Sequence, residues 1–135
     1  MKDKVFFDTN ILVYAYSDTE IEKQTIARKL ITECNSFIST QVIQELSNIL
    51  TKKFSKSWKE ALQTIAESCK NNRLHINEQS TIEYACTIAE KYKFTFYDSL
   101  IISAALQCNC KILYTEDLQH NQIIEKSLKI INPFI

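Results

Sequence analysis

The stretch KVFFDTN, residues 4–10, places a short apolar run directly before a carboxylate, a hydroxyl and an amide. An apolar run of this length, bounded by polar turn formers, is typical of a strand that is covered on both faces. In open α/β sheets ligands bind just beyond the carboxyl ends of the strands, so Asp8 is expected at a binding edge. Asp8 is also a good helix cap, and the apolar segment 11–16 could be the helix that it caps. Both roles are open at this point.

The rest of the chain alternates between helical and extended patterns. Apolar residues recur at helical spacing in segments 20–33, 40–53, 57–70, 80–92 and 94–107. Further short apolar runs predict strands at 36–39, 74–76, 111–115 and 129–131. The segments between strands are long enough for parallel pairing. We therefore predict one domain, residues 1–135, of class α/β: a three-layer α/β/α sandwich with a central, mostly parallel sheet of about five strands.

Two local signals refine this prediction. Ser80-Thr81-Ile82-Glu83 has the form of a capping box and is expected to open a helix. The chain has no glycine, which excludes a Walker loop, a dinucleotide-binding turn, a nucleophile elbow and an EF-hand loop. Tight turns must then use asparagine, as at Asn71-Asn72, Asn109 and Asn121.

Charge balance bears on the class of ligand. Sixteen basic and sixteen acidic side chains give a formal net charge of zero, so any polyanion has to bind a local patch. The candidate patch has lysines that could hold phosphates and aromatic residues that could stack a base: Lys52, Lys53, Lys56 and Lys59, with Phe54 and Trp58 interleaved. A solvated helix end with both aromatic side chains packed inward explains the same pattern.

Cysteine usage and hydropathy bear on location. The five cysteines are an odd number, no segment resembles a signal peptide, and no apolar run approaches the length of a membrane span. We expect reduced thiols, a cytoplasmic protein and no membrane partner. Cys108 and Cys110 do not complete a zinc set and are interpreted as core residues.

Four carboxylates are expected at one edge of the predicted sheet. Asp8 and Asp117 end strands, whereas Glu45 and Asp98 lie in or near the first turns of helices that follow the same edge. The sequence places no Arg or Lys among them, so their charges would repel and raise one another's pKa. Asp98 could alternatively serve only to stabilise the start of its helix.

A hard divalent cation, Mg²⁺ or Mn²⁺, is the natural counter-ion for such a cluster. A metal-bound water is a stronger nucleophile near neutral pH, and the metal stabilises charge on phosphoryl oxygens during an in-line displacement. Asn10 and Thr115 could orient ligands or water around the ion.

Four motifs match a known family in order and spacing. FFDTN at 6–10, VIQEL at 42–46, YDSLI at 97–101 before an Ala-rich helix, and YTEDLQH at 114–120 resemble the four signatures of the PIN-domain ribonucleases. The similarity covers essentially the whole chain, and its compact size resembles the VapC-like toxins of type II toxin-antitoxin modules. One departure is Asn121, which stands where such proteins often have glycine. Asparagine tolerates a left-handed conformation, so the turn can survive.

The resemblance implies a Mg²⁺- or Mn²⁺-dependent endoribonuclease whose metal-binding carboxylates are Asp8, Glu45, Asp98 and Asp117. Glu116 makes the fourth ligand ambiguous, and the family position favours Asp117. The resemblance further implies an RNA substrate, a homodimer and inhibition by a small antitoxin protein. We expect a segment of that partner to lie across the acidic pocket and present an Arg to the carboxylates in place of the metal.

Two other functions compete with this interpretation. A phosphatase of the haloacid dehalogenase type also has an Asp at the end of its first strand, but those enzymes resemble DxDxT there and residues 8–10 lack the second Asp. A PIN-like scaffold that binds RNA or a protein without cutting would be favoured if one of the four acids were missing, and all four are present.

Overall fold

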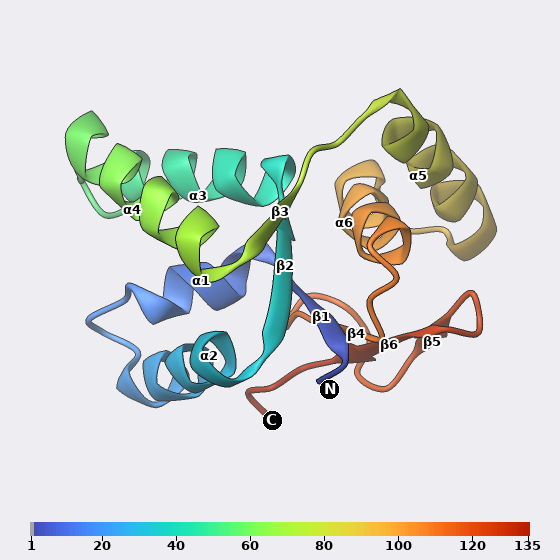
Figure 1. The fold of residues 1–135 in the computed structure, drawn as a ribbon, viewed down its shortest axis with the longest axis horizontal. Helices are drawn as coiled ribbons and strands as arrows, with labels where there is room; N and C mark the ends of the chain where they lie inside the picture. Colours follow the sequence, from blue (N-terminus) through green and yellow to red (C-terminus); the bar gives the residue numbers. More distant parts are fainter. Residues whose placement is uncertain (1) are drawn as a thin grey trace.

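The computed structural model describes residues 2–135, and its centre is a twisted six-stranded sheet (Figure 1). The strands are β1 (Lys4–Phe7), β2 (Asn35–Ser39), β3 (Arg73–His75), β4 (Ile112–Tyr114), β5 (Ile123–Ile124) and β6 (Leu128–Ile131). They lie in the order β3-β2-β1-β4-β6-β5, and every pair is parallel except β5 with β6. The predicted mostly parallel sheet is therefore confirmed, with β5 as an additional short antiparallel edge strand.

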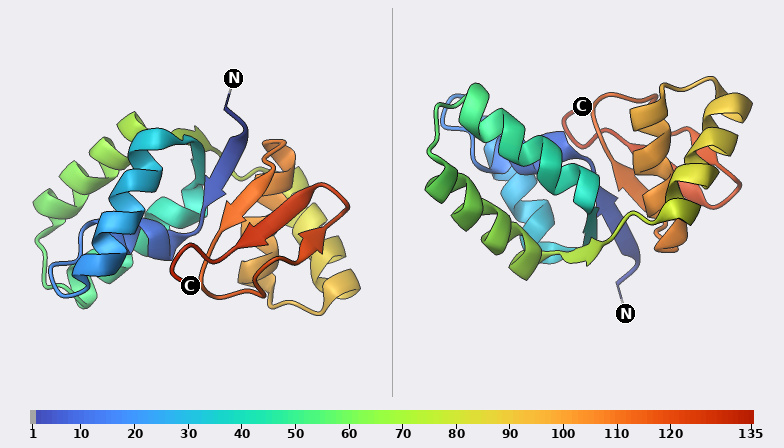
Figure 2. Two further views of the ribbon diagram at one scale, coloured as in Figure 1. Left: turned by 90° about the horizontal axis from the view of Figure 1, so that it is seen from below. Right: turned by 90° about the horizontal axis from the view of Figure 1, so that it is seen from above.

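Helices cover both faces of the sheet and complete the predicted three-layer α/β/α sandwich. They are α1 (Thr9–Ala15), α2 (Ile21–Glu33), α3 (Thr40–Lys52), α4 (Trp58–Asn71), α5 (Gln79–Tyr92) and α6 (Phe96–Gln107). Helices α1 to α4 lie on one side and α5 and α6 on the other (Figures 1 and 2). The crossover through α5 and α6 carries the chain from β3 past β1 to β4, so the strand order reverses beside β1. Such a reversal opens a crevice at the carboxyl ends of the strands.

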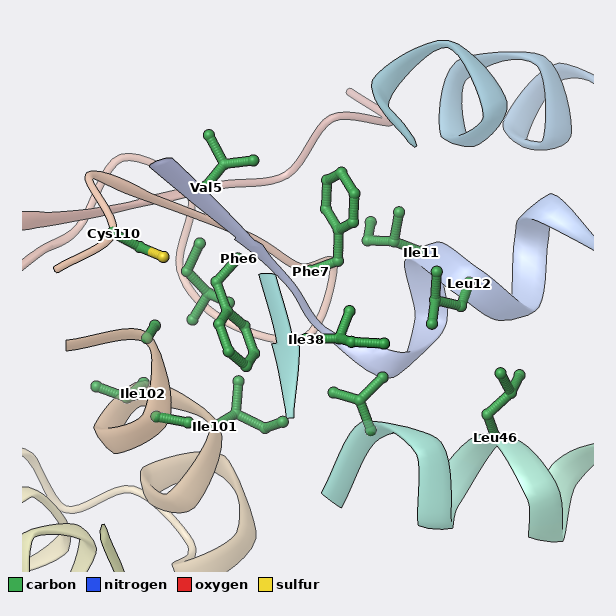
Figure 3. Close-up of a cluster of buried hydrophobic side chains, with 14 of the residues drawn as sticks. Val5, Phe6, Phe7, Ile11, Leu12, Ile38, Leu46, Ile101, Ile102 and Cys110 are labelled. Carbon is green, nitrogen blue, oxygen red and sulfur yellow. The ribbon is translucent and has the colours of Figure 1, made fainter. Parts of the chain in front are cut away.

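The core lies on both faces of β1. Phe6 and Phe7 are fully buried, and they point to opposite faces because side chains alternate along a strand (Figure 3). Phe6 points toward Ile101 of α6, whereas Phe7 points toward Ile11 of α1. Helix α6 is buried along its length from Ser99 to Ala105, as its nearly continuous apolar sequence predicts. Nowhere in residues 2–135 does a helix have both the length and the apolar character needed to cross a bilayer.

The start of α5 differs from the prediction. The expected capping box at Ser80 is wrong, because the helix begins at Gln79 with Glu78 as its N-cap. Thr81 is completely buried inside the first turn, and its Oγ1 accepts a hydrogen bond from the Glu78 amide at 3.1 Å and donates one to Gln107. The hydroxyl of Thr81 therefore satisfies the amide of the N-cap residue, the contact that the expected capping box would have given to the side chain of Glu83.

Asparagine replaces glycine at two left-handed turns. Asn109 follows α6 with φ of 59°, and Asn121 precedes β5 with φ of 72°. These two turn predictions are confirmed, and Asn121 adopts the left-handed conformation that the expected turn requires. Asn72 instead has extended backbone, with φ of −133°, and leads α4 directly into β3.

Truncating Ile102 should test the central position of α6. Ile102 is completely buried, so Ile102→Ala should lower the free energy of unfolding by about 2–5 kcal/mol through lost burial and a cavity. Ile82→Ala removes a side chain that is 45% exposed on α5 and should cost at most about 0.5 kcal/mol. Urea unfolding of the two variants measures the difference, and equal losses would contradict the buried position of α6.

Candidate active site

Asp8 lies at the point where β1 ends and α1 begins. Its side chain is 7% exposed, and both carboxylate oxygens accept hydrogen bonds. Oδ1 accepts from the Thr9 amide at 2.7 Å, and Oδ2 accepts from Thr115 Oγ1 at 2.8 Å. Asp8 is the N-cap of α1. The capping role and the place at the binding edge, which the sequence leaves as alternatives, therefore coincide in one side chain.

Asp117 lies beside Asp8 because the turn after β4 is tied to the same residues. Its amide donates to Thr115 Oγ1 at 3.1 Å, and its Oδ2 accepts from Asn10 Nδ2 at 3.0 Å. Thr115 thus contacts both Asp8 and the backbone of Asp117, while Asn10 contacts the Asp117 carboxylate. Asn10 and Thr115 therefore lie where they can orient the carboxylates of Asp117 and Asp8.

Glu45 and Asp98 approach from the two helices that flank the crevice. Glu45 lies in the second turn of α3, and its Oε1 accepts a hydrogen bond from Thr9 Oγ1 at 2.6 Å. Asp98 lies in the first turn of α6, where its amide donates to the N-cap hydroxyl of Thr95 at 3.2 Å. The hydrogen bond from Thr9 positions the Glu45 carboxylate, and nothing in the sequence pattern predicted this contact.

All four predicted carboxylates line one pocket with a volume of about 470 Å³. Glu116 also lines it, so the pocket is strongly acidic. Burial raises the pKa of Asp8 from 3.8 to about 6, and the charges of Asp117 and Glu45 act in the same direction, against the hydrogen bonds from Thr115 and Thr9. The pKa of Asp117 is also raised, by desolvation and by the nearby charges of Glu116 and Asp98. The pocket therefore favours a bound positive charge.

Basic side chains lie closer to the acids than the sequence suggested. Lys53 lines the acidic pocket, whereas Lys52, Lys56 and Lys59 are exposed and do not. Lys53, the C-cap of α3, therefore lies nearer the four acids than expected. The expectation that these acids have no basic partner is not contradicted, because no ion pair found within residues 2–135 joins a Lys or Arg to any of them. Trp58 is 72% exposed and so does not pack inward, although Phe54 packs against the core.

Glu116 has a set of partners different from that of Asp117. Tyr14 donates a hydrogen bond to its Oε1 at 2.5 Å, and Lys23 Nζ lies 3.2 Å from its Oε2. Lys23 also lies 4.6 Å from the centre of the Tyr14 ring. Both oxygens of Glu116 are therefore engaged on the side of α1 and α2. Sequence analysis missed this cluster because Lys23 and Glu116 are 93 residues apart and no local pattern connects them.

The donor set fits a hard divalent cation. It consists of carboxylate oxygens with an amide oxygen, Oδ1 of Asn10, which is buried and has no hydrogen-bond partner among the described residues. Oxygen ligands of this kind suit Mg²⁺ or Mn²⁺, and Mg²⁺ usually retains several waters. Within residues 2–135 no three acidic, His or Cys side chains already lie close enough to surround one ion. Water or substrate oxygens would therefore have to complete the coordination.

Comparisons with known proteins agree with this geometry. The family model described as "PIN domain" matches residues 5–126. A toxin-antitoxin complex from Klebsiella pneumoniae has a similar fold, with 18% identity and a TM-score of 0.72 over 96% of this chain and 97% of that chain. VapC20 of Mycobacterium tuberculosis, described as a sarcin-ricin loop cleaving toxin, has 14% identity and a TM-score of 0.69 over 84% and 91% of the two chains.

A third similar structure is VapBC2 from Rickettsia felis bound to a DNA fragment from its promoter. It has 21% identity and a TM-score of 0.67, and the alignment covers 96% of this chain and 99% of that chain. A comparison with curated proteins found no match. The chain belongs to the PIN domain family. The predicted resemblance to PIN-domain, VapC-like proteins is confirmed.

Replacing Asp8 by Asn should remove a pH-dependent loss of stability. Because the pKa of Asp8 rises from 3.8 to about 6 on folding, the folded chain favours the protonated carboxyl. The stabilisation that protonated Asp8 contributes is fully present below its pKa in the unfolded chain, 3.8. It is lost as the pH rises through its pKa in the folded chain, about 6. Relative to Asp8→Asn, the free energy of unfolding of the wild type should fall by up to about 3 kcal/mol across this range.

Urea unfolding in EDTA, measured from about pH 4 to pH 8, tests this difference. Parallel pH profiles of the wild type and Asp8→Asn would show that the carboxyl is not held in a desolvating environment.

Proposed function

We propose that the chain is a Mg²⁺- or Mn²⁺-dependent endoribonuclease and the toxin of a type II toxin-antitoxin system. The observation that carries the proposal is the convergence of Asp8, Glu45, Asp98 and Asp117 on one pocket at the carboxyl edge of the sheet. Membership of the PIN domain family supports the same activity. The reaction is hydrolysis of an RNA phosphodiester bond.

The four carboxylates would hold the metal, whose chemistry is to activate a water and stabilise charge on the phosphoryl oxygens. The chain's own residues prepare the site for it. Thr115 and the Thr9 amide fix Asp8, and Asn10 fixes Asp117. Thr9 Oγ1 fixes Oε1 of Glu45 and leaves its Oε2 for a cation or a water proton.

RNA would approach the pocket from the side of α3. Lys53 lines the pocket and supplies a positive charge beside the acids, where it can contact a phosphate. Lys52 and Lys56 are exposed near the same helix end and would contact phosphates further along the strand. The flanking charges would order the RNA backbone but would carry no sequence information.

We base the proposed role as a toxin on the structures with a similar fold, which include a toxin-antitoxin complex and VapBC2. An antitoxin protein would inhibit this chain by laying a segment across the acidic pocket and presenting an Arg to the carboxylates. We further propose a homodimer that acts in the cytoplasm.

A non-catalytic PIN-like scaffold is the second candidate function. It is favoured by one observation: among the described residues no three potential ligands are already close enough to enclose an ion. A scaffold would bind RNA or a protein at the same crevice and would leave the RNA intact. The two functions differ in whether the wild-type protein cleaves RNA in the presence of a divalent cation.

Cleavage of a mixed RNA substrate by the purified protein with Mg²⁺ or Mn²⁺ tests the proposed activity. Asp98→Asn preserves size and removes one charge from the pocket, so it should reduce the cleavage rate by roughly 100-fold or more while the fold persists. EDTA should have the same effect on the wild type.

Glu90→Gln is the matched control, because it removes a carboxylate that is 87% exposed on α5. It should cleave at the wild-type rate. Unchanged cleavage by Asp98→Asn would refute the metal-site assignment, and intact RNA with the wild type would favour the scaffold.

A further inference from the structure

A second groove adjoins the acidic pocket. Its volume is about 310 Å³, and its lining residues are Gln41, Gln44, Glu45, Asn48 and Tyr97. All of these except Gln44 also line the acidic pocket, so the two hollows are continuous. The groove is less acidic than the pocket, since its lining combines three primary amides and one phenol ring with the single carboxylate of Glu45, which the two hollows share, and contains no Lys or Arg. A ligand bound to the acids could therefore extend a neutral part into this groove.

Tyr97 supplies an exposed aromatic surface directly beside the acids. It precedes Asp98 in the first turn of α6, and its side chain is 66% exposed. The ring contacts Phe96 in an edge-to-face arrangement, with centroids 5.3 Å apart and an interplanar angle of 74°. An exposed tyrosine contributes little to the core, whereas a free ring face can stack a nucleobase.

Gln41 fixes the backbone of Tyr97. Its side chain is 4% exposed, and its Nε2 donates a hydrogen bond to the Tyr97 carbonyl at 3.1 Å. Its Oε1 is buried and has no partner within the described chain. An unpaired buried acceptor costs free energy, and a ligand that brings a hydrogen-bond donor to this oxygen would recover that cost.

Gln44 and Asn48 extend the row of amides along α3. Residues 41, 44 and 48 fall on one face of the helix because their spacing is three and four. Gln44 and Asn48 are exposed, so their amides are free to meet a ligand. Asparagine and glutamine amides pair with the edges of bases, most favourably with adenine, which offers both a donor and an acceptor.

We propose that this groove binds an unpaired base next to the scissile phosphate, with Tyr97 stacking on the base and the amides of Gln44 and Asn48 contacting its edge. The proposal rests on the ribonuclease function proposed above. The acceptor of Gln41 favours a base with an exocyclic amino group, so adenine is preferred over uracil. RNA bases can enter such a site only where they are unpaired, which makes single-stranded loops the substrate class.

Fluorescence anisotropy with labelled pentaadenylate and pentauridylate tests the base site separately from cleavage. Binding is measured in a calcium buffer, after electrophoresis confirms that the oligonucleotides are intact. The wild type should bind pentaadenylate several-fold more tightly than pentauridylate. Tyr97→Ala should weaken binding of both by about 10-fold, whereas Tyr97→Phe should change it less than about 2-fold because the ring is retained.

Two further variants address the amides and the location of the site. The double variant Gln44→Ala with Asn48→Ala should bring the ratio of the two affinities toward one. Gln63→Ala is the matched control, because it removes an exposed amide from α4, outside both hollows. It should bind like the wild type.

Two results would overturn the base site: unchanged affinity of Tyr97→Ala, or no binding of either oligonucleotide by the wild type. The expected binding pattern without any cleavage in Mg²⁺ would contradict the ribonuclease function and leave the base site supported. Cleavage with the same KM and kcat in the wild type and Tyr97→Ala would overturn the base site alone.

Discussion

The desolvated carboxylate of Asp8 is the constraint on which the site depends. Pairing of β1 with β4 fixes its position, because the Asp8 amide donates to the Tyr114 carbonyl at 3.0 Å and its Oδ2 accepts from Thr115 Oγ1. The same environment raises its pKa to about 6, so the folded chain holds an acid that is costly to ionise. A bound cation would offset that cost, which links the packing of the sheet to the metal-dependent function proposed above.

The other acidic side chains are arranged around Asp8 through residues next to it in the chain. Thr9 contacts Glu45 of α3, and Asn10 contacts Asp117 after β4. Three consecutive residues at the end of one buried strand therefore organise carboxylates from distant segments. Glu116 also lines the pocket, but Tyr14 and Lys23 engage both of its oxygens, which favours Asp117 over Glu116 as the acid that is free to bind a ligand beside Asp8.

The parts of this architecture that could be predicted follow from short-range rules. A buried parallel strand has a continuous apolar sequence, so a strand ending before Asp8 was predicted within residues 4–10, and β1 is that strand. The carboxyl edge of a parallel sheet then brought Asp8 and Asp117 together. The antiparallel β5 was missed because two residues are too few to show a period. The contacts of Thr9 with Glu45 and of Lys23 with Glu116 depend on side-chain positions across 36 and 93 residues, which no local pattern encodes. The groove beside Tyr97 likewise exists only once α3 and α6 meet.

The proposed function requires these carboxylates to bind a divalent cation together. The most direct measurement is the anomalous scattering of Mn²⁺ in crystals of the protein grown with that ion. We expect a peak within coordination distance of oxygens from Asp8 and from at least one of Asp98 and Asp117, with waters completing the shell. A Mn²⁺ peak elsewhere, or no peak although the pocket is open to solvent, would contradict a shared cation.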